Sequence, residues 1–190
     1  KKMSLFLVLL AAGDSKRLNS ITPKPFHKIN NKTLLEYSID SFKGFNEIKK
    51  TVVVYNKKHK KYLNKLRLKN IIKIQGGKSR QESSYKALKK IKKMRCKKVL
   101  IHDAARPSPP KILIKKLLNK LRKNDAVIPT IKTADATKRV NENIIFKNIL
   151  RENLRFAQTP QGFDFKKILK KYENNKNLSL NDDSSFFTEN

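Results

Sequence analysis

The chain has 190 residues, of which 38% are hydrophobic, so it is long enough for one compact domain with a buried core. Its 46 Lys and Arg against 15 Asp and Glu give a formal net charge of +31, which attracts polyanionic ligands in a salt-dependent way. Only nine of the basic residues are arginines, and the 37 lysines are spread over nearly every predicted helix. This distribution favours a solvated lysine-rich surface over a dedicated nucleic-acid site, because arginine is the preferred side chain for reading bases and gripping phosphates.

Two other classes are disfavoured by the sequence. No apolar run approaches the roughly 20 residues of a membrane-spanning helix, and the first apolar run lacks the features of a signal peptide. The single cysteine, Cys96, has no disulfide partner in the chain and belongs to no metal-binding cluster. We therefore expect a cytoplasmic protein with no membrane contact and no specific nucleic-acid partner.

The first predicted element is a strand over residues 4–10. Three residues with little or no side chain follow it: Ala11, Ala12 and Gly13. Their backbone N–H groups can approach phosphate oxygens closely and form an anion-binding nest. Arg17 and Lys24 then supply positive charge, so the order suits a nucleoside triphosphate, although a plain turn with solvated cations has the same pattern. The spacing is not that of a Walker P-loop.

Further along, apolar runs alternate with amphipathic stretches, which is typical of an α/β sheet. The pattern predicts helices over residues 33–42, 59–67, 80–92 and 111–122. It predicts strands over residues 50–55, 71–74, 98–102 and 126–129. Right-handed crossovers would make these strands largely parallel. Ligands of such sheets bind beyond the carboxyl ends of the strands, and each candidate motif falls at such an end.

A glycine pair lies between the predicted strand 71–74 and the following helix. Gly76 and Gly77 permit close approach of a ligand, Arg80 lies at the helix start, where anions are favoured, and Ser83 offers a hydroxyl one turn later. The cluster could hold a nucleotide base or ribose. A simple Gly-Gly turn with a capping serine would produce the same pattern.

The predicted strand 98–102 is followed by a carboxylate, two small residues and a guanidinium. Asp103 is placed like a magnesium ligand, because Mg²⁺ commonly takes only one or two carboxylates together with water and substrate phosphates. Arg106 can bind a second anionic group, but Asp103 and Arg106 could equally form a structural ion pair. We interpret His102 as a packed side chain at the strand end.

Four motifs, taken together and in order, resemble those of one family. They are Ala-Ala-Gly with Arg17 and Pro23-Lys24, Gly-Gly-x-x-Arg-x-x-Ser, His-Asp-Ala-Ala-Arg-Pro, and Gln-Thr-Pro-Gln within residues 151–163. Over essentially its whole length the chain resembles the 2-C-methyl-D-erythritol 4-phosphate cytidylyltransferases. Residues 181–185, Asn-Asp-Asp-Ser-Ser, also look like the family's late acidic motif.

The resemblance implies a Rossmann-like, mostly parallel mixed sheet flanked by helices, with a protruding β-arm. It implies Mg²⁺-dependent transfer of a cytidylyl group from CTP to methylerythritol phosphate, with release of pyrophosphate, in non-mevalonate isoprenoid biosynthesis. Arg17 and Lys24 would be catalytic, and Asp103 would hold the Mg²⁺. The residues that would bind CTP are Ala11, Ala12, Gly13, Gly76, Gly77, Arg80, Ser83, Asp103 and Ala104.

The second substrate and the partner subunit are also assigned by the resemblance. Arg106 and Arg151 would bind the phosphate of methylerythritol phosphate. The family's arm threonine falls on Ala136 unless a one-residue bulge substitutes Thr137, which we take as a further substrate-binding residue. In the family the arm, here about residues 130–153, inserts into a partner subunit, so a homodimer with composite sites is implied.

Two other functions remain open on the sequence alone. A ribitol-phosphate cytidylyltransferase shares the fold and the glycine-rich loops, and Ala104-Ala105 after the aspartate favours the erythritol enzyme only moderately. A basic nucleic-acid-binding module with degenerate nucleotide motifs is the alternative from a different class. We expect residues 1–190 to form a single nucleotidyltransferase domain that lacks the family's C-terminal strand.

Overall fold

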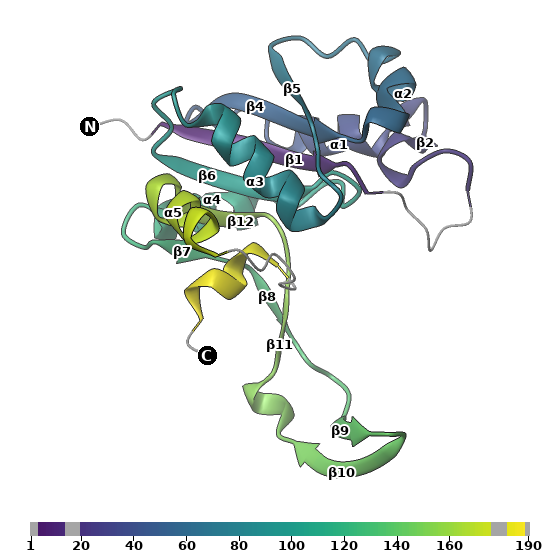
Figure 1. Ribbon diagram of the computed structural model, residues 1–190, viewed down its shortest axis with the longest axis vertical. Coiled ribbons are helices and arrows are strands. Elements are labelled where there is room, and N and C mark those ends of the chain that lie inside the picture. The colour runs from purple at the N-terminus through teal and green to yellow at the C-terminus, as the bar shows by residue number, and fades with distance from the viewer. Residues whose placement is uncertain (1–3, 14–19, 176–181, 189–190) are drawn as a thin grey trace.

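The computed structural model describes residues 4–13, 20–175 and 182–188, and its centre is a six-stranded sheet (Figure 1). In spatial order the strands are β5 (Ile71–Gln75), β4 (Ile48–Tyr55), β1 (Leu5–Ala11), β6 (Lys98–Asp103), β12 (Gln161–Asp164) and β7 (Ala126–Val127). The first four run parallel, whereas β12 is antiparallel to both β6 and β7. The expected mostly parallel mixed sheet is therefore confirmed.

Helices cover both faces of this sheet. They are α1 (Leu34–Ser41), α2 (Lys60–Asn64), α3 (Arg80–Ile91), α4 (Lys111–Leu121) and α5 (Phe165–Asn174). Helices α3 and α5 contribute to the core on one face, and α1, α2 and α4 contribute to the core on the other. The described residues also form short 3-10 helices, which are η2 (Lys24–Phe26), η3 (Lys57–His59), η4 (Arg151–Asn153) and η5 (Asp183–Phe187).

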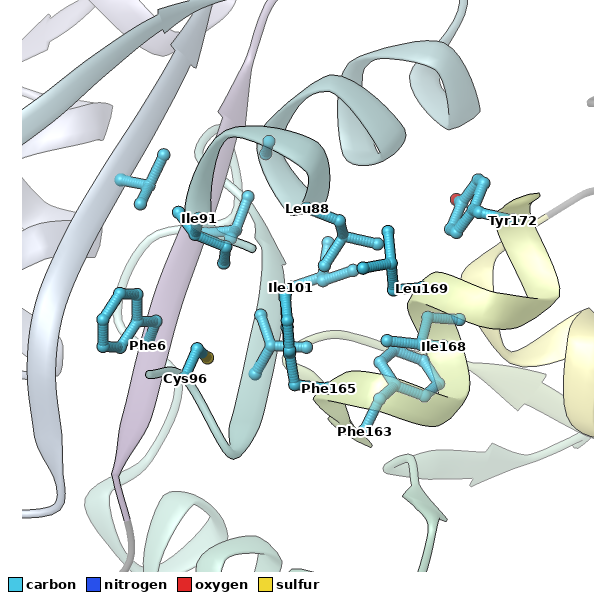
Figure 2. Close-up of a cluster of buried hydrophobic side chains, with 14 of the residues drawn as sticks. Phe6, Leu88, Ile91, Cys96, Ile101, Phe163, Phe165, Ile168, Leu169 and Tyr172 are labelled. Carbon is cyan, nitrogen blue, oxygen red and sulfur yellow. The ribbon is translucent and has the colours of Figure 1, made fainter. Parts of the chain in front are cut away.

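Strand β1 shows why the sheet needs two helical layers. Its alternate side chains point to opposite faces: Phe6 and Val8 belong to the cluster under α3 and α5, while Leu7 and Leu9 belong to the other. All four are essentially inaccessible to solvent. Figure 2 shows the first cluster, in which residues of α3 and α5 such as Leu88 and Ile168 lie with Ile101 of β6. A strand buried on both faces is typical of a parallel sheet.

Helix starts follow local capping chemistry. Thr33 and Glu36 form a capping box at α1, in which each side chain binds the other residue's backbone N–H. Ser79 caps α3 by accepting a hydrogen bond from the Glu82 backbone. The predicted helix 59–67 is wrong in its bounds, since η3 precedes a short α2 there, and the predicted strand 126–129 is only Ala126–Val127.

A β-arm leaves the sheet between β7 and β12 (Figure 1). Strands β8 (Thr130–Lys132) and β11 (Arg155–Ala157) pair antiparallel at its base, and β9 (Thr137–Asn141) pairs with β10 (Ile144–Ile149) beyond them. This is the protruding arm expected from the family resemblance. Two further strands, β2 (Lys28–Ile29) and β3 (Lys32–Thr33), form a small hairpin before α1. Across the described ranges, none of the helices has the length and apolar composition needed to cross a membrane.

Candidate active site

A cleft of about 1210 Å³ opens where four parallel strands end. Each strand contributes residues at or after its carboxyl end: Ala12 and Gly13 from β1, Asn56 and Lys57 from β4, Gly76 and Gly77 from β5, and Asp103 and Arg106 from β6. Because parallel strands bring their carboxyl ends to the same edge, motifs far apart in the sequence meet here. The prediction that the motifs lie at one end of the sheet is confirmed.

Nine of the predicted site residues line this cleft: Ala12, Gly13, Lys24, Gly76, Gly77, Arg80, Ser83, Asp103 and Arg106. Two of the predicted CTP-binding residues do not. Ala11 is a fully buried residue of β1, and Ala104 is fully buried with its N–H bound to the Leu10 carbonyl and its own carbonyl bound to the Ser38 hydroxyl. Both alanines belong to the buried cluster on the face of the sheet covered by α1, α2 and α4.

The three remaining predictions concern residues away from the cleft lining. Arg17 lies outside the described residues. Thr137 begins β9 and Arg151 begins η4, so both belong to the arm, where the Arg151 side chain is exposed and donates to the Ala134 carbonyl at 3.1 Å. Neither arm residue lines the cleft of its own chain.

Three cleft lysines were not singled out from the sequence: Lys57, Lys78 and Lys86. Lys57 follows the carboxyl end of β4, so the strand-end rule that found the other motifs could have found it too. Lys86 lies two turns into α3, and its ammonium contacts the Gly76 carbonyl at 3.2 Å and the Glu82 carboxylate at 3.1 Å. In a chain with 37 lysines, no sequence signal separates Lys78 and Lys86 from surface lysines.

The loop that carries Lys24 is anchored by its neighbours. Phe26 is buried and stacks on Tyr62, with ring centroids 5.6 Å apart. The His27 ring Nε2 lies 2.6 Å from the Thr22 carbonyl, so it donates to that oxygen. Lys24 therefore projects its charge from a fixed backbone into the cleft.

The Gly-Gly loop is shaped by protein contacts. A Cβ added at Gly76 would lie 2.7 Å from both the Ala12 Cβ and the Ser83 Oγ. The Ser83 hydroxyl accepts from the Gly77 N–H at 3.0 Å and donates to the Ser79 carbonyl at 2.9 Å. The cap of α3 is Ser79, so Ser83 holds the glycine loop against the helix. A role for Ser83 in contacting CTP stays a prediction.

Asp103 lies between two arginines. Its Oδ1 is 3.3 Å from Arg80 Nε and its Oδ2 is 3.2 Å from Arg106 Nε. Arg106 is about half exposed and also donates to the Gln158 amide oxygen at 2.8 Å. The ion pair between Asp103 and Arg106 that the sequence left open is thus present, and Arg80 is a second partner of the same carboxylate.

Arg80 in turn reaches a fully buried carboxylate. Its Nη1 lies 2.5 Å from Asp183 Oδ2, and the Tyr172 hydroxyl donates to Asp183 Oδ1 at 2.5 Å. Burial acts to lower the pKa of Arg80, but the charges of Asp183 and Asp103 outweigh it and the pKa is raised. Burial and the adjacent charge of Asp183 raise the pKa of Tyr172. Arg80 therefore stays charged and Tyr172 stays a hydrogen-bond donor at neutral pH.

His102 is a packed strand-end side chain, as predicted. It is buried, its Nε2 lies 2.8 Å from the Arg106 carbonyl, and its Nδ1 lies 2.8 Å from the Thr159 hydroxyl. Burial lowers the pKa of His102 to about 4. The neutral ring donates to the carbonyl and accepts from the hydroxyl, and so ties the β6 end to the segment before β12.

The charge of the cleft suits a polyphosphate. Six cations line it, namely Lys24, Lys57, Lys78, Arg80, Lys86 and Arg106, against the carboxylates of Glu82 and Asp103. No group of three or more metal-ligating side chains is found in the part of the chain that the structure describes. Asp103 nevertheless fits a magnesium ion, because its carboxylate is partly exposed in the cleft and Mg²⁺ draws its remaining ligands from water and phosphates.

Comparison with known proteins assigns the chain to a family. The family profile of 2-C-methyl-D-erythritol 4-phosphate cytidylyltransferase matches residues 5–189. The chain belongs to this family. The resemblance read from the four motifs is thereby confirmed.

Individual cytidylyltransferases and their structures agree with this assignment. The chain is 49% identical to the bifunctional enzyme IspD/IspF of Pelagibacter ubique, over 97% of this chain and 49% of that protein. It is 33% identical to the 2-C-methyl-D-erythritol 4-phosphate cytidylyltransferase of Clostridioides difficile, over 97% of this chain and 80% of that one. The crystal structure of 4-diphosphocytidyl-2C-methyl-D-erythritol synthase from Anaerococcus prevotii superposes with a TM-score of 0.81 at 29% identity, covering 98% of this chain and 82% of that chain. The chain therefore spans about half the length of the bifunctional relative and four fifths of the single-function one.

Proposed function

We propose that this chain transfers a cytidylyl group from CTP to 2-C-methyl-D-erythritol 4-phosphate and releases pyrophosphate, in isoprenoid precursor biosynthesis. The observation that carries the proposal is the cleft at the strand ends, where small residues, Lys24, Arg80 and Asp103 converge in a member of this family. The single cysteine, Cys96, is buried and free, which suits the reducing cytoplasm that we propose as the setting.

The reaction needs positioning and charge stabilisation. A phosphate oxygen of the acceptor forms a bond to the α-phosphorus of CTP, the bond from that phosphorus to the bridging oxygen breaks, and pyrophosphate leaves with the electron pair. Lys24, which lines the cleft, would neutralise the charge that accumulates on the phosphate oxygens. Backbone N–H groups near Ala12 and Gly13 would bind phosphate oxygens, and Arg17 is proposed as a second catalytic cation.

Asp103 would hold the divalent cation, which we propose is Mg²⁺. When bound, the cation would supply positive charge that stabilises the negative charge of the CTP phosphates. Arg106, half exposed beside Asp103, would bind the phosphate of the acceptor. Replacing Asp103 with asparagine keeps the shape and removes the charge, so we expect the Asp103→Asn variant to need much more Mg²⁺ for half-maximal rate.

We further propose that the arm packs against a second copy of the chain and completes that copy's site with Thr137 and Arg151. Among the described residues, ten large hydrophobic side chains are exposed, and seven of them lie within residues 131–156. Such a concentration of exposed apolar surface marks an interaction site.

Mixing Lys24→Ala with Arg151→Ala chains tests the composite site, since one intact site can form in the mixed dimer. Activity that stays absent on mixing would contradict it.

The proposed reaction is tested by Mg²⁺-dependent pyrophosphate release from CTP, with methylerythritol phosphate and ribitol phosphate offered as alternative acceptors. We expect release with methylerythritol phosphate. Preference for ribitol phosphate would reassign the acceptor. A protein that shows no CTP-dependent rise in melting temperature but binds RNA tightly at physiological salt would instead be the basic nucleic-acid-binding module.

A further inference from the structure

The buried contact between Arg80 and Asp183 lies outside the reaction described above. Asp183 begins η5 and has no solvent exposure, whereas Arg80 begins α3 and reaches the cleft. An unpaired buried carboxylate is costly, so this residue requires the partners that it has. Each of its two oxygens binds one of them: Oδ2 binds Arg80 Nη1, and Oδ1 accepts from the Tyr172 hydroxyl.

Tyr172 is itself fixed by packing. It lies on α5 at the edge of the buried cluster in Figure 2. Its ring stacks on Tyr85 of α3 at an interplanar angle of 7° and meets the edge of Phe186 of η5, with centroids 5.5 and 4.6 Å away. The tyrosine therefore holds its hydroxyl against Asp183 from a rigid position.

The guanidinium of Arg80 is divided between two carboxylates. Its Nε points to Asp103 in the cleft and its Nη1 points to Asp183 in the interior. Its Nη2 is buried and has no hydrogen-bond partner among the described residues. Arginine prefers to bind a carboxylate with two parallel N–H groups, but here neither carboxylate receives such a pair.

The division of the Arg80 guanidinium between two carboxylates affects how well Asp103 can bind a cation. A carboxylate gripped by a full two-pronged arginine is largely neutralised and binds a cation poorly. We propose that Asp183 is a positioning residue that draws part of the Arg80 charge away from Asp103, which keeps Asp103 able to bind a divalent cation. The inference rests on the proposed function, in which Asp103 holds that cation.

Tyr172 has the opposite influence. Its hydroxyl donates to Asp183 Oδ1 and so takes one of the acceptor positions that the unpartnered Nη2 of Arg80 could otherwise use. Removing the hydroxyl lets Asp183 take both Nη1 and Nη2, which draws Arg80 further from Asp103. Replacing Asp183 should therefore weaken the affinity of Asp103 for a divalent cation, and removing the Tyr172 hydroxyl should strengthen it. A general loss of packing would weaken the affinity in both variants.

The test measures Mn²⁺ binding by electron paramagnetic resonance, in the presence of CTP and without an acceptor, so that no turnover is needed. We expect Asp183→Asn to weaken Mn²⁺ binding by about tenfold, because the whole guanidinium charge then falls on Asp103. We expect Tyr172→Phe to tighten it by about threefold. Asp103→Asn identifies the site, since it should abolish this binding.

Glu173→Gln is the matched control. Glu173 follows Tyr172 in α5 and pairs with Lys92 at the surface at 2.9 Å. The Mn²⁺ affinity of this variant should equal that of the wild type. Unchanged affinity in a folded Asp183→Asn protein, or weakening in both that variant and Tyr172→Phe, overturns the inference. If Asp183→Asn does not fold, the test rests on Tyr172→Phe. An Mn²⁺ affinity of Tyr172→Phe that is equal to or weaker than that of the wild type then overturns the inference.

The same measurement separates this inference from the proposed function. A wild-type chain that binds no Mn²⁺ with CTP removes the metal role of Asp103, and the inference is overturned with it. A wild-type chain that binds Mn²⁺ and variants that match it overturn the positioning role alone. Pyrophosphate release, measured separately, tests the reaction.

Discussion

The sheet buries its apolar side chains, whereas the arm exposes them. In the sheet, strands such as β1 and β6 bury both faces, and the carboxyl ends that emerge from this rigid layer carry the cleft residues. In the arm, β9 and β10 leave nearly every side chain exposed, including Phe146 at 57%. The sheet is thus stabilised by burial within its own chain, whereas the arm leaves apolar surface exposed, which suits the partner contact that we propose.

Truncating a phenylalanine in each region should have the largest effect. Phe163 of β12 is fully buried and Phe146 is exposed. We expect Phe163→Ala to lower the free energy of unfolding by about 3–5 kcal/mol, since it leaves a cavity in the core. Phe146→Ala should change it by less than about 0.5 kcal/mol and weaken self-association instead.

Urea unfolding at low protein concentration and analytical ultracentrifugation measure these two effects. Equal loss of unfolding free energy in both variants would show that the arm is part of the folding unit. Unchanged self-association in Phe146→Ala would remove that side chain from the proposed dimer contact.

The second test asks whether the cleft end of the sheet carries the chemistry. We expect Lys24→Ala to lower the rate of transfer by roughly 10²–10³-fold, a typical cost of losing one group that stabilises transition-state charge. The fold should be unaffected, because the Lys24 side chain is exposed and its loop is anchored by Phe26. Lys28→Ala is the control, since Lys28 is an exposed cation of the same region that does not line the cleft. Near-normal turnover of Lys24→Ala would defeat the assignment.

The third test uses a titratable group that links the sheet to the base of the arm. Burial holds the pKa of His102 at about 4 in the folded chain, against about 6.5 when unfolded. The unfolded chain therefore binds a proton first as the pH falls. The contribution of His102 to the free energy of unfolding is fully present above about pH 6.5. It is lost as the pH falls from 6.5 to 4, by roughly 3 kcal/mol in all.

Thermal or urea unfolding at pH 7 and pH 5 measures this loss in the wild type and in His102→Gln. Other acids titrate in the same range, so the difference between the two proteins is the relevant quantity. The variant should lose less stability between the two pH values, and an identical loss would mean that folding does not lower the pKa of His102.

The sequence could predict the sheet and the strand-end residues because both follow from local patterns. Apolar runs of the right length marked β1, β4, β5 and β6, and chemistry-bearing residues after them had to meet at one edge. Strand β12 could not be found this way, since four residues including Gly162 carry no clear alternation, and its place between β6 and β7 is a tertiary effect.

The partners of Arg80 were also beyond local reasoning. Asp183 lies 103 positions away in the chain, and the late acidic motif gave no indication that its second aspartate would be buried against α3. At Gly76 protein atoms also approach closely, since an added Cβ would meet Ala12 and Ser83, and this contact could not be read from the sequence. The approach of a ligand to Gly76 stays a prediction.

At the cleft, the loop of Gly76 takes part both in packing and in the proposed binding of CTP, so a substitution there should affect both. In Gly76→Ala the new Cβ would lie 2.7 Å from the Ala12 Cβ and the Ser83 Oγ, so the loop must shift away from β1 and α3. We expect about 1–3 kcal/mol of lost stability from overpacking and a higher KM for CTP. Gly13→Ala is the matched control, because no atom of the described residues lies within 4 Å of its added Cβ, and its unfolding free energy should stay within about 0.5 kcal/mol of the wild type. If Gly76→Ala kept wild-type stability and KM, the loop would be able to move freely, and the cleft end would resemble the arm more than the rigid sheet that supports it.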